Sequence, residues 1–260
     1  MEKDRIRLAA IGDIHYGRPQ DSIQPAFAQI ASTVDILLLL GDLTNTGLPE
    51  EAKKFARDLT SSVKIPIIGV LGNHDFESGR QTEVRDVLQE AGVTILDGEA
   101  HEVQGIGFAG VKGFAGGFDR GSLQPWGEDI VKLFVREAVN EALKLEAALA
   151  KLRTVHRIAL LHYSPIRQTV EGEPLEIFPY LGSSRLEEPL NRYQVTAAFH
   201  GHAHRGKLEG FTQAKIPVYN VAMSVLQHIF PDRPPFYILE LPSAAPVTTS
   251  QATAPGGVST

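Results

Sequence analysis

The sequence contains no cysteine and no excess of basic residues, and each absence excludes a class of protein. Without cysteine among its 260 residues, the chain has no disulfide, no zinc–thiolate site and no cysteine nucleophile. With 25 Lys and Arg against 31 Asp and Glu, the formal net charge is -6. This charge argues against a broad nucleic-acid-binding surface, which normally carries a basic excess. It does not exclude an anionic substrate, because bound metal ions make a site locally positive.

Long apolar segments are also missing. The N-terminal MEKDRIRLAAIGDIH holds too short an apolar run for a signal peptide, and no span approaches the length of a membrane helix. We therefore expect no membrane association and a cytoplasmic location. The other proportions, 43% apolar and 22% charged residues, are ordinary for a globular protein. The length permits one domain or two small ones, and we favour a single domain over residues 1–242.

Five short apolar runs recur along the chain, and polar residues of the kind that bind metals follow each of them. The runs are residues 6–11, 36–40, 67–71, 158–161 and 195–199. They show little alternation between apolar and polar positions, which is typical of strands buried on both faces.

The segments between the strand-like runs carry helical signals, and we predict helices over residues 21–33, 49–59, 81–91 and 128–152. The second of these begins with a proline and two glutamates, which favour a first turn, and Gly92 is a C-cap residue for the third. In the longest, apolar residues recur every three to four positions: Ile130, Phe134, Ala138, Ala142, Leu145, Leu149 and Leu152. Strand–helix–strand alternation in the first half predicts parallel strands with right-handed crossovers.

The second half contains short strand-like segments within residues 103–111 and 211–241, including VYNV at 218–221 and FYIL at 236–239. We expect them in a second sheet that packs on the first, with helices outside both. The predicted fold class is therefore α/β, with two packed mixed sheets in an α/β/β/α sandwich. Residues 113–126 are glycine-rich and predict a loop without nucleotide-binding spacing. Residues 243–260 are small and polar and predict a disordered tail.

The ends of the five runs supply a set of metal-preferring side chains. In an open α/β sheet, ligand groups gather at the carboxyl ends of the strands, so these side chains are expected to converge at one rim. They are Asp13 and His15, Asp42, Asn73 and His74, His162, and the histidines of HGHAH at 200–204. Carboxylates, an amide and imidazoles without thiolates suit Mn, Fe or Zn. The set is too large for one ion, so we expect two divalent metals.

The order of these motifs resembles the signature of the calcineurin-like metallophosphoesterase superfamily. The matching segments are GDIH at 12–15, GDLTNTG at 41–47, GNHD at 72–75, LHYSP at 161–165 and GHAH at 201–204. They appear in the family's order, and every metal-binding position is filled. The resemblance implies hydrolysis of a small phosphoester substrate by a hydroxide that two metal ions share.

The resemblance also implies a role for each motif residue. The ligands divide between two ions that share one carboxylate: Asp13, His15 and His204 for one ion, Asn73, His162 and His202 for the other, and Asp42 as the bridge. His74 is implied as a catalytic residue that is not a ligand, and that protonates the leaving oxygen or stabilises charge on the phosphoryl group.

Several other polar or aromatic residues keep two interpretations. Asp75 either orients His74 or a ligand, or begins the following turn. His200 has no place in the signature, and we expect it to pack or to support a ligand. Structural roles are expected for His101, His156 and His228. Loop arginines contact substrate phosphate or are solvated surface charges: Arg18, Arg80, Arg120, Arg167 and Arg205. Aromatic residues of the glycine-rich segment form a wall beside the metals or pack on the long helix: Phe114, Phe118 and Trp126.

Other functions fit the motifs less well. Protein serine/threonine phosphatases usually have an aspartate and an arginine in the second motif, roughly GDxVDRG, whereas Asn45 and Gly47 stand in this one. A phosphodiesterase-like enzyme is therefore favoured. A DNA-processing nuclease of the same superfamily is an alternative that the lack of basic excess disfavours. The segment HGHAH at 200–204 superficially resembles a metallo-β-lactamase-type motif, but the aspartate of that motif is missing and Arg205 follows His204, so this alternative is poor. A non-catalytic binding scaffold is an alternative that the complete ligand set disfavours. The oligomeric state is left open.

Overall fold

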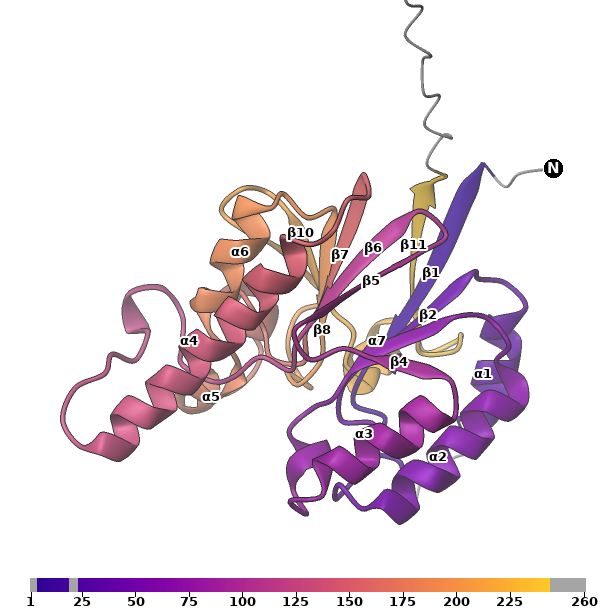
Figure 1. Cartoon of the computed structure of the whole chain (residues 1–260), viewed down its shortest axis with the longest axis horizontal. Helices are drawn as coiled ribbons and strands as arrows, with labels where there is room; N and C mark the ends of the chain where they lie inside the picture. The colour runs from indigo at the N-terminus through magenta and orange to yellow at the C-terminus, as the bar shows by residue number, and fades with distance from the viewer. Residues whose placement is uncertain (1–3, 19–22, 244–260) are drawn as a thin grey trace, which may run out of the picture.

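Figure 1 shows a computed structural model of the chain, in which two sheets lie between two groups of helices. The structure describes residues 4–18 and 23–243. The first sheet has five strands in the order β11-β1-β2-β3-β4, and the second has six in the order β5-β6-β7-β8-β10-β9. Both sheets combine parallel and antiparallel pairs, so the predicted sandwich of two mixed sheets is confirmed.

The first sheet is built from the apolar runs of the N-terminal half. Its parallel strands are β1 (Arg5–Ile11), β2 (Ile36–Leu40), β3 (Ile67–Val70) and β4 (Val93–Ile95). Every residue of β2 is buried, as a run without alternation predicts for a central strand. The motifs at residues 12–15, 41–47 and 72–75 therefore lie in the loops at the carboxyl ends of β1, β2 and β3.

The last strand, β11 (Tyr237–Pro242), corrects one expectation from the sequence. Residues 236–239 were expected in the second sheet, but β11 pairs antiparallel with β1 in the first, with Arg5 opposite Pro242. The physical reason is that β1 would otherwise present an unpaired edge, and β11 satisfies its backbone groups. A short apolar run does not encode which edge it will cover.

The second sheet has four parallel strands in its centre: β6 (Ile106–Gly110), β7 (His156–Leu160), β8 (Ala197–His200) and β10 (Pro217–Asn220). Antiparallel strands lie at its edges, β5 (Glu99–Val103) and β9 (Glu209–Phe211). Phe108 and Leu160 belong to the core between the two sheets, whereas Ala109 and Ala159 belong to the cluster under the outer helices. This alternation packs the sheet on both faces.

Three helices cover the first sheet: α1 (Gln24–Ala31), α2 (Pro49–Ser62) and α3 (Gln81–Glu90). The predicted helix 21–33 begins later than expected, and residues 21–22 lie outside the described residues. In α2, Pro49 stands in the first turn while Phe55 and Leu59 are buried. The C-cap of α3 is Ala91, and Gly92, predicted as the C-cap, follows it with φ +94° and donates its N–H to the Gln89 carbonyl, so the helix ends at the expected glycine one residue later.

The outer face of the second sheet is covered by α4 (Asp129–Leu149), α5 (Phe178–Leu181) and α6 (Glu187–Arg192). The N-terminal end of α4 extends beyond the rest of the fold in Figure 1. Ile130, the first residue of the apolar pattern, is therefore 72% exposed and does not pack on the core. Periodicity places residues on one face of a helix, but that face is buried only as far as the sheet reaches, from Val135 onward.

The remaining elements are short: η1 (His74–Phe76), η2 (Asp119–Gly121), η3 (Arg167–Val170), η4 (Leu175–Ile177), η5 (Ser184–Leu186) and α7 (Met223–Ile229). Apart from η2, residues 113–126 form the predicted loop. Of the predicted tail, only Ser243 is described, and residues 244–260 lie outside the described residues. No helix within residues 4–18 and 23–243 has the length and apolar character needed to cross a bilayer.

Candidate metal centre

The loops after β1, β2, β3, β7 and β8 meet where the two sheets come together. The Asp13 N–H donates to the Gly41 carbonyl at 3.0 Å, which joins the first two motifs. The Gly201 N–H donates to the His162 carbonyl at 3.2 Å, which joins the last two. Across the sheets, His162 Nδ1 lies 2.9 Å from the Leu40 carbonyl oxygen. The predicted convergence at one rim is therefore present, with loops from both sheets.

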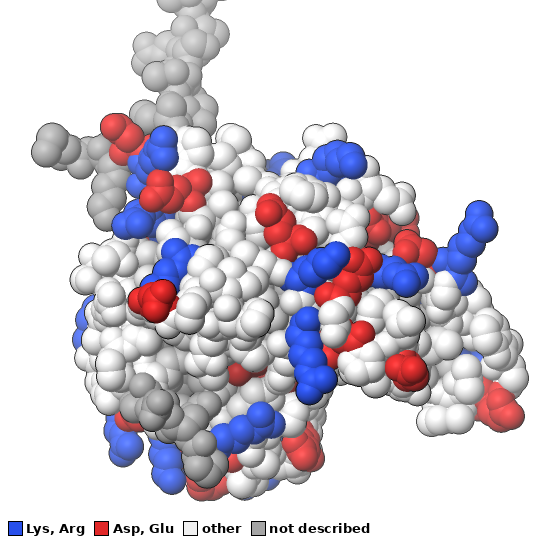
Figure 2. Space-filling model, turned by 180° about the vertical axis from the view of Figure 1, so that it is seen from behind, with Lys and Arg blue, Asp and Glu red and all other residues white. Residues whose placement is uncertain are grey.

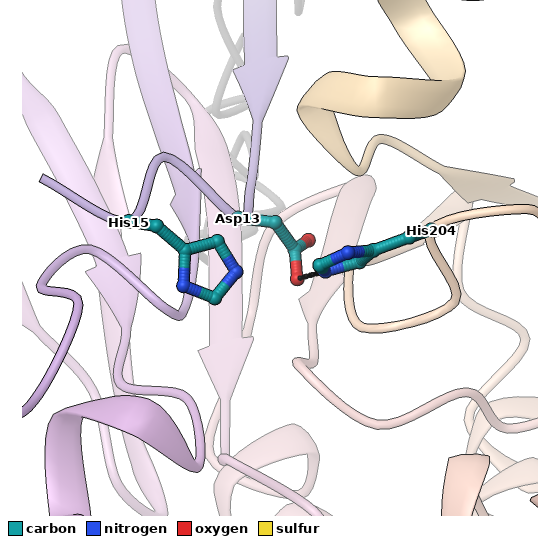
Figure 3. Close-up of side chains that lie close together, drawn as sticks. All are labelled: Asp13, His15 and His204. Atoms are coloured by element: carbon teal, nitrogen blue, oxygen red, sulfur yellow. Dashed lines mark hydrogen bonds and ion pairs between the residues drawn. The ribbon is translucent and has the colours of Figure 1, made fainter. Parts of the chain in front are cut away.

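One group of side chains lies after β1 and β8. Figure 3 shows the Asp13 carboxylate between the rings of His15 and His204. His204 Nε2 is 2.9 Å from Asp13 Oδ1, and the two rings have centroids 5.4 Å apart. One ligand atom from each of the three residues lies within 4.8 Å of the other two, so together they could hold an ion.

A second group lies after β2, β7 and β8 and, like the first, has two buried members. Asp42, His162 and His202 also offer ligand atoms within 4.8 Å of one another. His162 Nε2 is 3.4 Å from Asp42 Oδ1 and 2.9 Å from Asn73 Oδ1, which places the asparagine amide at this group. The His162 and His202 rings are 4.9 Å apart.

Asp42 lies between the two groups. Its Oδ2 is 3.7 Å from His15 Nε2, while its Oδ1 faces His162. A third set of ligand atoms within 4.8 Å consists of His15, Asp42 and His74. The His74 ring is only 4.6 Å from the His15 ring, so its geometry alone permits ligation as well as proton transfer.

Backbone carbonyls fix which ring nitrogen of three histidines faces the centre. His162 Nδ1 lies 2.9 Å from the Leu40 carbonyl oxygen, His74 Nδ1 lies 2.8 Å from that of Asn45, and His202 Nε2 lies 3.1 Å from that of Tyr180. Because a carbonyl only accepts, each of these nitrogens carries the proton. The other ring nitrogen of each histidine is then the one that can bind a metal or exchange a proton, and in His162 this atom, Nε2, lies 2.9 Å from the Asn73 amide oxygen.

The chemistry of these side chains fits cations. His15 is 3% exposed, and neither of its ring nitrogens has a hydrogen-bond partner among the described residues. Such orphaned polar atoms are rare in folded proteins, and a metal ion would satisfy one of them. Burial lowers the pKa of His15 and of His202 to about 4, so both rings are neutral at pH 7, which is the form that binds metals.

The carboxylates point to the same conclusion. Burial, with the neighbouring charges of Asp13 and Asp75, raises the pKa of Asp42 well above its usual range. A divalent ion beside Asp42 would restore its ionised form, since opposite charge favours ionisation. The buried aspartates and histidines are thus consistent with a binuclear metal site.

The backbone at the centre is strained. Asp13, His15, Asp42 and His202 adopt left-handed conformations, with φ of 57°, 47°, 49° and 69°. Residues other than glycine rarely occupy this region, and each costs on the order of 1–3 kcal/mol. Such strain concentrates at functional sites, where the surrounding structure enforces it.

Asp75 supports the centre from behind. Its buried carboxylate accepts the N–H groups of Gly72 and Thr44, both at 2.8 Å, and the Thr44 hydroxyl at 2.6 Å. It therefore ties the second motif to the third, while also standing in the first turn of η1. In the same region the His74 N–H donates to Asp42 Oδ1 at 2.8 Å. Both interpretations of Asp75 hold in part, because it positions the loops rather than the His74 ring.

His200 lies apart from all three groups of ligand atoms. It is fully buried at the end of β8, where its Nδ1 is 2.7 Å from the Gly201 carbonyl oxygen and its Nε2 is 2.8 Å from Thr169 Oγ1. Burial lowers its pKa to about 4. The remaining three histidines lie within β5, β7 and α7 and belong to no group of potential ligands among the described residues: His101, His156 and His228.

The loop arginines differ in their surroundings. Arg18 Nε donates to the Asn45 side chain in the second motif, which brings it beside the centre. Arg80 instead makes two hydrogen bonds to Glu83, at 2.8 and 2.7 Å, and the Arg167 guanidinium lies over the Phe178 ring. Arg120 and Arg205 are exposed. Of the five, Arg18 is the one bonded to a motif side chain.

The aromatic residues of the glycine-rich segment also separate. The Phe114 ring is 4.9 Å from that of Phe134 on α4 and 6.0 Å from that of Tyr163. Because the Tyr163 ring lies 4.4 Å from the His202 ring, Phe114 both packs on the long helix and borders the centre. Phe118 is buried, whereas Trp126 is 59% exposed.

Sequence reasoning missed two contributors. Tyr163, directly after His162, packs on His202, and its place inside the LHYSP motif was the available signal. Glu141 is a buried carboxylate on α4 that accepts the Gly113 N–H at 2.7 Å and holds the glycine-rich loop. Its position among the apolar residues of the α4 pattern gave no sign of this role.

Comparison with known proteins extends these findings. The profile of the family described as calcineurin-like phosphoesterase matches residues 6–206. A search of curated proteins gave no match. Among solved structures, the chain is similar to a phosphopantetheinyl hydrolase from Mycobacterium tuberculosis, with a TM-score of 0.66, 14% identity, and 97% of this chain and 99% of that chain covered.

Two further similar structures belong to longer chains. A putative 5'-nucleotidase from Staphylococcus aureus has a TM-score of 0.52 and 15% identity, covering 83% of this chain and 48% of its own. A purple acid phosphatase from yellow lupin (Lupinus luteus) seeds has a TM-score of 0.50 and 15% identity, covering 77% and 38%. These structural similarities concern the fold alone. The family, by contrast, is shown by the sequence match over residues 6–206: the chain belongs to the calcineurin-like phosphoesterase family.

Proposed function

We propose that the protein is a binuclear metal-dependent phosphoesterase that hydrolyses phosphodiesters or small phosphate esters. The observation that carries the proposal is the pair of His/Asp groups that meet at Asp42, each with ligand atoms within 4.8 Å. Members of this family are generally hydrolases of phosphoester bonds. The nitrogen and oxygen donors suit Mn, Fe or Zn.

The proposed ligands divide as the two groups do. Asp13, His15 and His204 would hold one ion, and Asn73, His162 and His202 the other. Asp42 would bridge them, which its position between His15 Nε2 and His162 Nε2 supports. When bound, the two ions would polarise the phosphoryl group and activate a water molecule.

His74 is the proposed proton donor to the leaving oxygen. Its Nδ1–H is held by the Asn45 carbonyl, so Nε2 is the atom available to the substrate. The Glu77 carboxylate, 3.1 Å from Nδ1, offers a counter-charge to the protonated ring. The His74 N–H bond to Asp42 fixes the backbone of this residue relative to the ligands. Proton transfer is therefore assigned to His74 Nε2.

Small substrates fit the surface charge better than nucleic acid. On the face in Figure 2, Lys and Arg side chains lie among Asp and Glu and form no continuous basic surface there. A polyanionic strand gains its affinity from many neutralised phosphates, which such a face does not supply.

A second candidate substrate is a phosphopantetheinyl ester. The Mycobacterium tuberculosis structure is described as a phosphopantetheinyl hydrolase, and it matches almost the full length of both chains, unlike the nucleotidase and the purple acid phosphatase. Because the two chains match over almost their whole lengths, this substrate is included in the test; the similarity itself is one of fold.

The test uses metal-stripped protein to which one divalent metal is added at a time. We expect Mn²⁺ to start hydrolysis of bis(p-nitrophenyl) phosphate. This diester has a good leaving group, so its hydrolysis depends least on protonation of the leaving oxygen and on contacts to the leaving alcohol. A panel of monoesters, linear diesters, 2′,3′- and 3′,5′-cyclic nucleotides, phosphopantetheinyl esters and single-stranded DNA then ranks the substrates. No turnover with Mn, Fe or Zn would contradict the proposal and favour a binding scaffold.

His74→Ala is expected to retain metal and to lose turnover by about 10²–10⁴-fold, the usual contribution of a general acid. The loss is expected to be largest for diesters whose leaving alcohol has a high pKa, since these depend most on protonation. Metal content and rates for a series of leaving groups measure both effects. His228→Ala, on the exposed part of α7, is the control. Loss of a metal ion would show instead that His74 is a ligand.

A further inference from the structure

Lys112, two residues after the end of β6, has unusual surroundings. Its Nζ lies 5.3 Å from the Phe76 ring centroid, 5.0 Å from that of Phe114 and 5.2 Å from that of Tyr163. It donates one hydrogen bond, to the Gly113 carbonyl at 2.8 Å, and forms no ion pair with any residue in the described ranges. Burial lowers the pKa of Lys112. A half-buried ammonium without a carboxylate partner is costly, which points to a function.

The ammonium lines a cavity of about 260 Å³. The cavity has apolar walls of Leu71, Phe76, Ile95 and Leu96, and its polar lining includes Gln81 at the start of α3. The Gln81 Oε1 atom is buried and lacks a hydrogen-bond partner among the described residues. The cavity lining thus offers the N–H groups of Lys112 that Gly113 does not accept, whereas the Gln81 Oε1 atom is enclosed.

The other charged groups of the cavity are already paired. Arg85 donates to Glu99 at 2.9 Å, and Asp97 accepts from Lys144 at 3.0 Å. Lys144 is shared between Asp97 and Glu141, at 2.7 Å from the latter, so Lys112 is the cationic lining residue of the cavity that has no ion pair among the described residues. A cationic group placed beside Lys112 Nζ would therefore meet an ammonium that no carboxylate contacts directly within the described residues.

The cavity adjoins the candidate metal centre. Leu71 and Phe76 flank the loop that carries Asn73 and His74. The Lys112 carbonyl accepts the N–H groups of His162 and Tyr163, both at 3.0 Å. The cavity residues Leu71 and Leu96 directly follow β3 and β4, at the rim where the metal-binding motifs lie. In α/β folds, ligands bind in this position outside the strand ends.

We propose that this cavity, the Lys112 pocket, binds the alcohol portion of the phosphoester and selects polar, non-cationic alcohols over cationic ones; this rests on the proposed function. A hydroxyl or amide oxygen of the alcohol accepts a hydrogen bond from Lys112, whose Nζ makes one such bond within the described residues. The apolar walls take the carbon chain. A cationic alcohol meets the Lys112 ammonium and is repelled.

Inhibition of bis(p-nitrophenyl) phosphate hydrolysis by two phosphomonoesters tests the pocket. sn-Glycerol 3-phosphate carries a neutral polyol and phosphocholine carries a cation, and both offer the same phosphate to the metals. With Mn²⁺-loaded protein, glycerol 3-phosphate is expected to inhibit about tenfold or more better, the range of a hydrogen bond to a charged group. In Lys112→Met this preference is expected to disappear, whereas Lys112→Arg retains it.

The matched control is Lys132→Met, which removes a lysine on α4 that pairs with Asp129. Thr82 is an exposed residue of the cavity lining, and Thr82→Trp fills the cavity without changing its charge. This substitution is expected to weaken inhibition by glycerol 3-phosphate by a similar factor. Unchanged inhibition in Lys112→Met or Thr82→Trp, or equal inhibition of the unaltered protein by both compounds, would overturn the pocket while leaving the phosphoesterase intact. Absence of any turnover would overturn both.

Discussion

Asp42→Asn is expected to remove metal from at least one site and to lower turnover by about 10³-fold or more, which corresponds to roughly 4 kcal/mol of transition-state stabilisation. The side chain is 1% exposed and lies between His15 and His162. An asparagine keeps the shape and can still accept the His74 N–H, but it brings no negative charge and one oxygen only. Two ions would then lose the group that joins them and offsets their charge.

Metal content per chain and the rate of bis(p-nitrophenyl) phosphate hydrolysis measure the effect. Asp86→Asn is the matched control, because Asp86 is an exposed aspartate on α3. It is expected to keep both metal and rate. Full activity with intact metal content in Asp42→Asn would refute the bridging role.

Gly72→Ala is expected to damage the centre through shape alone. A Cβ at this position would come closer to Oδ1 and N of Asp42 than real Cβ atoms come to any neighbour, and it would lie 2.8 Å from His162 Cε1. Both proposed ligands must move, and the buried surroundings resist such a shift. We expect loss of metal, near-complete loss of turnover, and a decrease of roughly 1–3 kcal/mol in the free energy of unfolding, the usual cost of overpacking.

Gly121→Ala provides the control for this substitution. An added Cβ at Gly121 meets nothing within 4 Å, so stability and turnover are expected to stay unchanged. Thermal unfolding, metal content and rate are compared for the two variants. If Gly72→Ala kept its metal and its rate, the described packing of Gly72 against Asp42 would be wrong.

The sequence predicted the parts of the fold that depend on local pattern. The run of leucines in β2 has no polar partner positions and is buried throughout, as a central parallel strand must be. Pro49 and the two glutamates after it define the start of α2, and Gly92 ends α3 through its left-handed backbone. The candidate site followed from the same logic, since each motif lies at the carboxyl end of a strand.

The parts that failed depend on contacts between distant segments. β11 joins the first sheet because β1, more than two hundred positions earlier in the chain, has a free edge there. The exposure of Ile130 depends on how far α4 extends past the sheet. The surroundings of Lys112 arise from Phe76, Phe114 and Tyr163, which belong to three segments far apart in the sequence. No local periodicity reports on such encounters.

The central claim is that two metal ions share Asp42, and anomalous scattering from crystals grown with Mn²⁺ tests it most directly. We predict two peaks per chain about 3.5–4 Å apart, the usual separation in two-metal sites. The ligands of one are expected to be Asp13, His15 and His204, those of the other Asn73, His162 and His202, with Asp42 contacting both. A single peak, no peak, or two peaks without Asp42 between them would contradict the account.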